Sequence, residues 1–358
     1  MVRGLAVTGC GVLSPAGAGL EVLADALDGR AAASADTTSV ATEEPLPEPV
    51  WAVPDFRIAD QLGRKGTRNL DRTTGLGLVA CRTAIEPYGG DQRDVGVVVT
   101  TGLGSVRSIS EFARDTWIWD KPHLVDPRAF PNTVMNSCAG QIAIRYGMRG
   151  VNATVAGGHV GGLHAIRYAR NAVDQGQAER LVVGGVEELC AQTAWAWRKS
   201  GVLDPGMPVG EACAFFALES RRTAESASRP VLAELLACEV RFVPPPLAPG
   251  RIRDGLADCI ERALARSGVG ADEVELVATG ADGLRGLGVL EERVVAQAFP
   301  VPRVRVRSVV GEVFSATASL QLAAVLARWR ADGAAGRVAL ITSLGLDGNV
   351  GCLVVRSG

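Results

Sequence analysis

The sequence predicts an α/β protein made of two similar halves. One observation is a repeated order of strand, helix, strand and strand, expected first over residues 152–156, 160–176, 181–185 and 212–218, and again over 304–308, 313–330, 337–342 and 350–356. The other is that 47% of the 358 residues are apolar, enough for a large core. We therefore expect halves at 1–228 and 229–358, related by an approximate twofold axis, with His159 and Glu312 at equivalent helix starts.

The remaining elements follow from apolar periodicity and from glycine and proline. Residues 4–9 are an apolar run typical of a buried strand rather than a signal peptide, because glycines interrupt the run and Pro15 follows; residues 10–17 read as a turn. Further helices are expected over 18–28, 67–86, 106–118 and 252–267, and further strands over 94–100 and 274–278. Segments 32–55 and 243–250 have no period and are predicted to be surface loops, the first of them mobile.

Composition excludes several classes of function. The 37 basic and 39 acidic residues give a net charge of −2, which is no electrostatic footprint for nucleic acid or an anionic membrane. The eight cysteines form no CxxC pair, which favours free buried thiols in a reducing cytoplasm. No glycine motif opens a nucleotide-binding unit and no ligands have metal spacing, so neither a cofactor nor a metal is expected.

The chain has only three histidines, and one of them stands in an unusual context. His159 lies within Gly-Gly-His-Val-Gly-Gly, between a predicted strand and a predicted helix. Such an elbow aims a side chain at a cavity near free backbone N–H groups, and the helix dipole disfavours a charged imidazole there. Two interpretations stay open: an inert polar plug, or a group for proton transfer or decarboxylation. His123 is expected in a loop, His164 in the core or an interface, and Cys138 as a small buried residue.

Several motifs together resemble those of the β-ketoacyl synthases. They are residues 133–150 followed by 155–166, together with 7–15, 63–65, 181–187 and the glycine loop 343–349. The resemblance covers nearly the whole chain and keeps the family's order. It implies a thiolase-like fold of five αβαβα layers built from two pseudo-symmetric halves.

The resemblance also reveals three departures at the family's catalytic positions. His159 stands where the nucleophilic cysteine is expected, Gly280 where the first catalytic histidine is expected, and Glu312 where the second is expected. Claisen condensation needs a thiolate to hold the acyl chain and imidazoles to support decarboxylation. We therefore expect no catalytic residues for condensation in this chain.

Among relatives of this kind, the chain resembles the chain-length factors of type II polyketide synthases. These proteins often carry glutamine at the elbow, in a context similar to residues 155–163. The resemblance implies pairing with an active ketosynthase, an acyl tunnel at the dimer interface, and an acyl carrier protein as a further partner. His159 and the short connection 331–336 are departures that suggest a divergent branch acting on linear or polyene chains.

The resemblance further implies which residues form the tunnel and the interface. Bulky side chains near the closed end of the tunnel are expected at Phe112, Thr116, Trp119, Thr133 and Met135. The strand that pairs across the dimer is expected to include Asn152, Ala153, Thr154 and Val155.

Other interpretations remain open at this point. The basic residues Arg64, Lys65, Arg68 and Arg72 would suit either an acidic carrier protein or a solvated face. A stand-alone acyltransferase, hydrolase or malonyl decarboxylase would use His159 and Glu312, with Asp282 as a third group. A third possibility is a carrier-protein scaffold without a tunnel.

Overall fold

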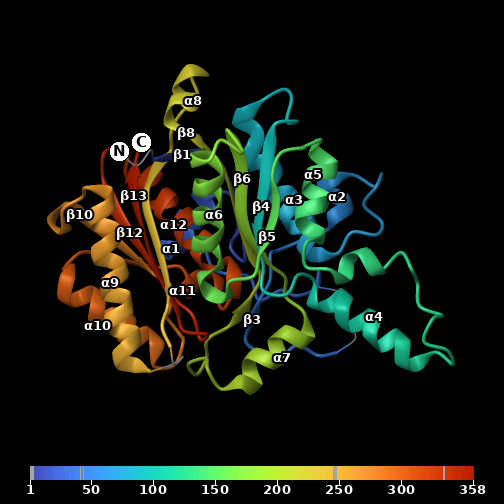
Figure 1. Ribbon diagram of the computed structural model, residues 1–358. Helices are drawn as coiled ribbons and strands as arrows, with labels where there is room; N and C mark the ends of the chain where they lie inside the picture. Colours follow the sequence, from blue (N-terminus) through green and yellow to red (C-terminus); the bar gives the residue numbers. More distant parts are fainter. Residues whose placement is uncertain (1–3, 41, 43, 245–247, 334) are drawn as a thin grey trace.

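The computed structural model describes residues 4–40, 42, 44–244, 248–333 and 335–358, which form five layers (Figure 1). Two layers of strands alternate with three layers of helices, and both termini lie at the same edge of the molecule. The α/β architecture of two similar halves is therefore confirmed. The middle of the loop predicted over 243–250 lies outside the described residues.

Each strand layer has five principal strands with the same order and directions. In the first layer the order is β5 (Asn152–Val155), β4 (Val95–Thr100), β6 (Arg180–Glu187), β8 (Ala212–Ser220) and β1 (Leu5–Ser14). In the second it is β11 (Arg303–Arg305), β10 (Val274–Thr279), β12 (Val338–Leu344), β13 (Asn349–Ser357) and β9 (Ala233–Phe242). The first three strands of each layer are parallel and the last two are antiparallel to their neighbours.

Short pairings complete the sheets. Strand β1 bonds to β9 over residues 5–7, which joins the two layers into one hydrogen-bonded array. Strand β2 (Gly17–Ala18) pairs with the end of β1, and β3 (Val50–Trp51) runs parallel to β7 (Val209–Gly210).

The helices sort by layer. One outer layer contains α3 (Arg72–Ile85) and α5 (Ser137–Tyr146), and the other contains α9 (Pro249–Ser267) and α10 (Leu287–Ala298). The central layer contains α1 (Leu20–Leu27), α6 (Gly161–Asp174) and α12 (Thr317–Asp332). Helix α12 buries 12 of its 16 residues, as expected for a helix enclosed between two sheets.

The other helices lie at the edges. They are α2 (Ile58–Leu62), α4 (Val106–Ile118), α7 (Ala191–Ser200), α8 (Arg221–Ser226) and α11 (Arg307–Val310), with the 3₁₀ turns η1 (Glu86–Tyr88), η2 (Phe130–Thr133), η3 (Gly158–Val160), η4 (Ala271–Glu273) and η5 (Phe314–Ala316). Helix α4 projects from the body as an arm (Figure 1). In the described part of the chain, no helix has the length and apolar character needed to cross a membrane.

The turn predicted over residues 10–17 is wrong for its first half, because β1 continues to Ser14. The glycines that suggested a turn serve close packing instead. A Cβ atom on Gly9 would lie 2.0 Å from the carbonyl oxygen of Ala84, and one on Gly11 would lie 2.0 Å from that of Ala80. Helix α3 thus packs directly on the backbone of β1.

The loop predicted over residues 32–55 is also partly wrong. Val50, Ala52 and Val53 are buried, and Val50 belongs to β3. The backbone N–H of Ala52 donates to the Ser34 carbonyl at 3.1 Å, which holds the segment against itself. Apolar side chains therefore fold this stretch onto the body despite its lack of period.

The second copy of the repeat begins differently from the prediction. The strand expected over 304–308 ends at Arg305, and the helix expected over 313–330 begins only at Thr317. Gly311 and Phe314 have φ of 76° and 37°, which a continuous helix does not allow, so α11 and η5 occupy the intervening residues.

Candidate functional site

His159 lies in the elbow that the sequence predicts. Strand β5 leads through two glycines into η3 and then α6, and Gly158 has the positive φ of 52° that the turn requires. The side chain of His159 points inward and its residue is only 1% exposed. The Ser343 hydroxyl donates to the His159 carbonyl at 3.0 Å, so the glycine loop 343–349 is held against the elbow.

The second half contains the same turn, but Glu312 is not its equivalent of His159. Gly157 and Val313 share φ and ψ, at −127° and 28° against −128° and 26°, and the residues that follow both have positive φ. Ser315 therefore corresponds to His159. The prediction that His159 and Glu312 are equivalent is wrong, because Glu312 precedes the turn.

His159 and Glu312 nevertheless meet. Nε2 of His159 lies 3.3 Å from Oε1 of Glu312, and the same oxygen accepts a hydrogen bond of 2.7 Å from the backbone N–H of Phe314. The other carboxylate oxygen pairs with Arg307, whose side chain is fully buried. Within the described residues neither ring nitrogen of His159 makes a hydrogen bond. The result is a buried cluster formed by the ion pair of Arg307 and Glu312 and the imidazole of His159.

The charge of Glu312 is fixed by its neighbours. Burial favours the neutral carboxyl, but the positive charge of Arg307 and the contact with His159 outweigh burial and lower the pKa of Glu312 to about 2. Glu312 is therefore ionised at neutral pH and is already engaged by a permanent cation. The expectation that His159 is neutral stays a prediction.

Two aromatic rings cover the imidazole. The ring centroid of Phe314 lies 4.9 Å from that of His159, the centroid of Trp197 lies 5.6 Å from it, and the two aromatic rings are 5.3 Å apart. Neither Arg307 nor these rings were found by sequence reasoning. Only the five-residue spacing from Arg307 to Glu312 could have suggested the ion pair, since burial of the arginine is not visible in the sequence.

Gly280, the third altered position, directly follows β10 and leaves no room for a side chain. A Cβ atom there would lie 2.8 Å from the Thr342 carbonyl oxygen and 2.9 Å from the side-chain oxygen of Gln321. The Gln321 amide donates at 2.8 Å to the carbonyls of Ala278 and Thr342, so it links the ends of β10 and β12. The space beside Gly280 is thus already packed.

Asp282 takes no part in the His159 cluster. Its carboxylate accepts a hydrogen bond of 2.6 Å from the Thr279 hydroxyl and lies 3.4 Å from Arg305. The predicted trio of His159, Glu312 and Asp282 is therefore wrong in its third member, because the turn after β10 directs Asp282 toward its own strand and β11.

The predicted tunnel residues lie on α4 and around η2. The rings of Phe112 and Phe130 meet edge to face at 5.8 Å, and Thr116 bonds within its own helix. Thr133 follows Phe130 in η2, and Met135 packs against Gly104. With Trp119, which is half exposed, these candidates are open to solvent or only partly buried, so the tunnel remains a prediction.

The predicted interface strand is an edge strand. β5 bonds to β4 on one side only, with Asn152 exposed and residues 153–155 half-buried. Its other edge therefore presents free backbone groups in the described part of the chain. Such an edge suits pairing with another strand, and pairing itself stays a prediction.

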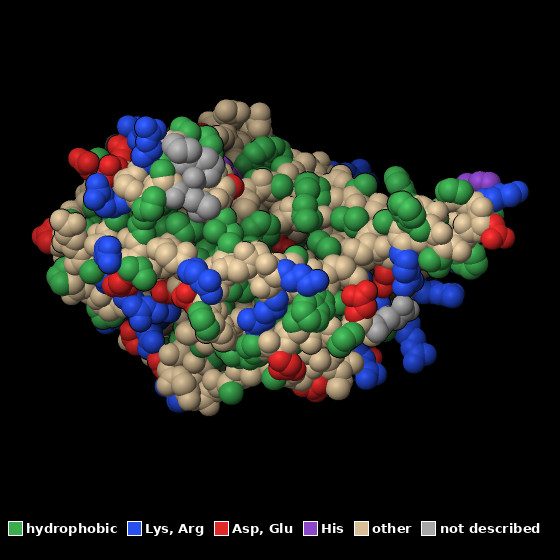
Figure 2. Space-filling model, turned by 90° about the horizontal axis from the view of Figure 1, so that it is seen from below, with side chains coloured by type: hydrophobic (Ala, Val, Ile, Leu, Met, Phe, Trp, Pro, Cys, Tyr) green, Lys and Arg blue, Asp and Glu red, His purple; other side chains and the backbone are tan. Residues whose placement is uncertain are grey.

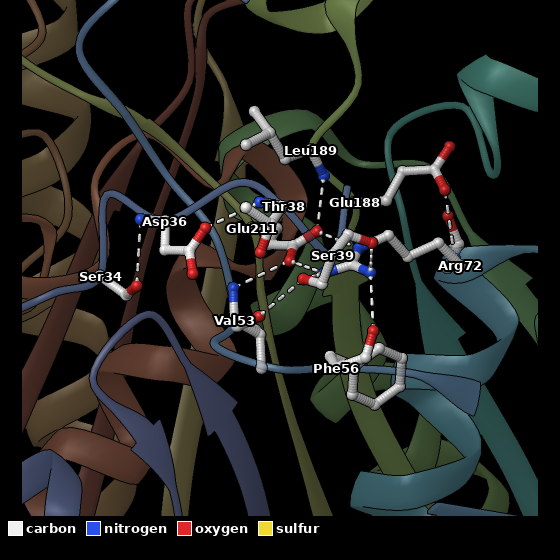
Figure 3. A network of polar contacts seen from close by, with 11 residues as sticks. Ser34, Asp36, Thr38, Ser39, Val53, Phe56, Arg72, Glu188, Leu189 and Glu211 are labelled. Atoms are coloured by element: carbon white, nitrogen blue, oxygen red, sulfur yellow. Dashed lines mark hydrogen bonds and ion pairs between the residues drawn. The ribbon is translucent and has the colours of Figure 1, made fainter. Parts of the chain in front are cut away.

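The basic stretch divides into two parts. Arg64, Lys65 and Arg68 are exposed, but Arg72 is not available to a partner. Its guanidinium pairs with the fully buried carboxylate of Glu211 at 2.5 Å and donates to carbonyls of Ser39 and Phe56 (Figure 3). The docking role predicted for Arg72 is wrong, because this ion pair holds the segment before α2 against the core.

Cys138 and His123 lie as expected, and the interface role of His164 stays a prediction. Cys138 is buried in α5, and seven of the eight cysteines are buried and all are free. His123 is exposed beyond α4, and His164 is half-buried in α6.

The layer order, the internal repeat and the strand–elbow–helix unit define a thiolase-like protein. Residues 3–224 match the model of the β-ketoacyl synthase N-terminal domain. The chain therefore belongs to the β-ketoacyl synthase family, and the resemblance seen in its motifs is confirmed.

Individual relatives extend the match beyond that domain. The chain is 28% identical to the actinorhodin polyketide putative beta-ketoacyl synthase 2 of Streptomyces coelicolor, over 94% of this chain and 88% of that one. The solved ishigamide ketosynthase/chain length factor is 34% identical, with a TM-score of 0.87 and 99% of both chains covered. A β-ketoacyl synthase from Burkholderia phymatum, 19% identical with a TM-score of 0.83, shares the fold.

Proposed function

We propose that this chain is a chain-length factor: a subunit that does not condense acyl groups itself and shapes the product of a partner ketosynthase. The observation that carries the proposal is the buried cluster at the elbow. The resemblance assigns His159 to the position of the nucleophile and Glu312 to that of a catalytic histidine, and Glu312 is paired with Arg307 and in contact with His159. Gly280 contributes no side chain.

Condensation would need a thiolate that this elbow does not offer. His159 carries no thiol, and Cys138, which the sequence places near the cavity, is buried at 2% exposure. Burial raises the pKa of Cys138 well above its ordinary value, which opposes formation of a thiolate. The chain therefore needs a partner that supplies the nucleophile.

The surface supports such a partner. Eight large apolar side chains between residues 103 and 144 are exposed: Leu103, Trp117, Ile118, Trp119, Leu124, Phe130, Val134 and Ile144. Figure 2 views this region from below and shows apolar side chains along the projecting arm. Together with the free edge of β5, this forms a surface that a monomer would not stabilise, and obligate interfaces bury roughly 2,000–5,000 Å².

We infer that the partner is an active ketosynthase of the same fold and that the arm completes its acyl tunnel. The solved ishigamide ketosynthase/chain length factor, similar over the whole chain, supports this pairing. Phe112, Thr116, Trp119, Thr133 and Met135 would then line the tunnel, because a partner seated against α4 and η2 would cover them.

An acyl carrier protein is the second proposed partner. A cleft of about 830 Å³ lies between the α2–α3 region and α4, and Arg64 and Arg68 line it. Lys and Arg side chains gather near the base of the arm in Figure 2. An acidic carrier protein would complement this charge, with the partner ketosynthase taking the remaining contacts.

The experiment is co-expression with an active type II ketosynthase. We expect copurification as a stoichiometric pair and condensation only by the pair. A soluble, stable monomer that does not bind the ketosynthase would contradict the proposal.

A second candidate is an independent acyltransferase, hydrolase or malonyl decarboxylase that uses His159 and Glu312. The 3.3 Å contact between the two side chains favours it, since a carboxylate beside an imidazole is the arrangement of a general base and its orienting group. Turnover of acyl or malonyl carrier substrates by the purified chain without a partner would support this candidate.

A further inference from the structure

An apolar cavity of about 180 Å³ lies beside the elbow, at the base of the projecting arm. The larger apolar side chains in its wall are Leu103, Val106, Trp197, Val209, Val313 and Phe314. Leu103 is 57% exposed, so the cavity reaches the surface where α4 begins.

The inner end of the cavity is closed by two rings. Phe314 and Trp197 both line the cavity and both contact the imidazole of His159, which is itself 1% exposed. The rings therefore stand between the cavity and the His159 imidazole, while Glu312 of the buried cluster also borders the cavity. We call this pair of rings the floor.

The altered catalytic residues hold the floor in place. The backbone N–H of Phe314 donates to Glu312, which Arg307 and His159 engage from the other side. Gly102 leaves space for the Phe314 ring, because a Cβ atom at Gly102 would lie 2.4 Å from it. The cluster that replaced the catalytic groups thus supports an aromatic wall.

The cavity suits an uncharged, apolar group. Three acidic residues lie in its wall, and the oxygens of each are engaged by other groups. Glu187 accepts a hydrogen bond from the Gly102 N–H at 2.5 Å, and Glu188 accepts one from the Ser105 hydroxyl at 2.9 Å. Glu312 pairs with Arg307 and accepts from the Phe314 N–H. No lysine or arginine of the described residues lines it. Nearby carboxyls and the lack of a cation disfavour an anion, whereas a hydrocarbon end would displace only water from apolar walls.

The cavity also continues the wall that we assign to the tunnel. Phe112 and Thr116 are four residues apart and share one face of α4, the helix that begins at Val106. Val106 lines the cavity, and Phe112 and Thr116 belong to the proposed tunnel. An acyl chain that enters along α4 from a partner, passing Phe112 and Thr116, would reach Leu103 and Val106 at the start of the helix last.

We infer that this cavity receives the far, hydrocarbon end of the acyl chain held by the partner ketosynthase, with Phe314 and Trp197 as the floor that limits its length. The inference rests on the proposed function. It adds a terminal chamber in the non-condensing subunit and two specificity-determining residues that the sequence did not single out.

The test measures product length by mass spectrometry for the wild-type pair and for pairs that carry single substitutions in this chain. Val106→Phe fills the cavity and is expected to shorten the product by at least one two-carbon unit. Phe314→Leu removes part of the floor, which deepens the cavity, and is expected to lengthen the product. Val289→Phe, at an exposed position on α10, is the matched control and should change nothing.

The outcomes separate this inference from the proposed function. Unchanged product length in both cavity variants, in pairs that still form and condense, would overturn the terminal chamber alone. Absence of pairing or condensation in the wild type would overturn the proposed function and the chamber together. Where Val106→Phe fails to fold, Leu103→Trp fills the exposed mouth, and shorter products support the chamber while unchanged products overturn it.

Discussion

The elbow around His159 encloses charged groups, whereas α4 carries large apolar side chains into solvent. Arg307 and Glu312 are at most 1% exposed, while Trp117 on the arm is 88% exposed. Burying charged groups and exposing large apolar side chains are each unfavourable in isolation, but the two costs are offset in different ways. The buried charges compensate one another within the chain, whereas we propose that a second protein covers the arm. On that proposal the surface that shapes the product lies on the arm and not at the elbow.

The largest effect on stability is expected from breaking the buried ion pair between Arg307 and Glu312 at the elbow. Glu312→Ala leaves the buried Arg307 without its carboxylate and should lower the free energy of unfolding by about 3–5 kcal/mol. Urea unfolding followed by circular dichroism measures it. Glu225→Ala breaks the exposed pair with Arg221 and serves as the control, with little change expected. An equally small change for Glu312→Ala would show that the cluster is not a compensated unit.

Removing an apolar group from the arm should weaken pairing rather than folding. Trp117→Ala is expected to cost about 2 kcal/mol of binding, roughly a 30-fold rise in Kd for the ketosynthase, with an unchanged melting temperature of the isolated chain. Titration of the two purified subunits measures it. Trp195→Ala, at a tryptophan on α7, is the matched control, and equal Kd values for both variants would argue against the arm as the interface.

Stability should respond to pH in opposite ways at the two kinds of buried carboxyl. Burial raises the pKa of Glu187 to about 8 and that of Glu188 to about 7 from an ordinary value of 4.5. The folded state then binds more protons than the unfolded state between pH 4.5 and 8, so the free energy of unfolding falls as pH rises, by at most about 1.4 kcal/mol per pH unit for each group.

Glu312 acts in the other direction. Its lowered pKa contributes stability that is present above pH 4.5 and is lost as pH falls toward 2. Unfolding from pH 5 to 9 should show a smaller slope in Glu187→Gln than in the wild type, while exposed Glu261→Gln keeps the slope. A wild-type free energy of unfolding that rises with pH over this range would contradict the assignment.

The smallest structural change is expected to alter the product. Phe112→Ala or Trp119→Ala removes bulk from the proposed tunnel wall and should lengthen the product of the pair by one or more two-carbon units. Mass spectrometry of the released acyl chains measures it. Unchanged length after substitution at Phe112, Thr116, Trp119, Thr133 and Met135 would reject the tunnel assignment.

Sequence reasoning located the layers and the elbow because both leave local signals. The glycines around His159 mark the turn, and the apolar runs of β4 and β6 mark buried strands. Strand β9 was missed, because its period is broken by Glu239 and Arg241 near its end. The glycines of β1 led to the wrong prediction of a turn. In the sequence, a glycine that allows a helix to pack on the backbone cannot be distinguished from a glycine that turns the chain.

The site was predicted only as far as its three altered positions. The contact of His159 with Glu312 was anticipated as a consequence of the repeat, although the turn that brings them together is offset by three residues. Arg307, Trp197 and Phe314 complete the site through burial, and burial of an arginine depends on tertiary contacts that no local pattern encodes. Arg72 shows the same limit in the basic stretch.

The central claim is tested most directly by locating the acyl chain during turnover. The pair should be quenched while it extends a carrier-bound substrate, digested, and searched by mass spectrometry for acylated peptides. We expect the thioester on a cysteine of the partner ketosynthase and none on peptides of this chain. An acyl group bound covalently to this chain during turnover would contradict the claim.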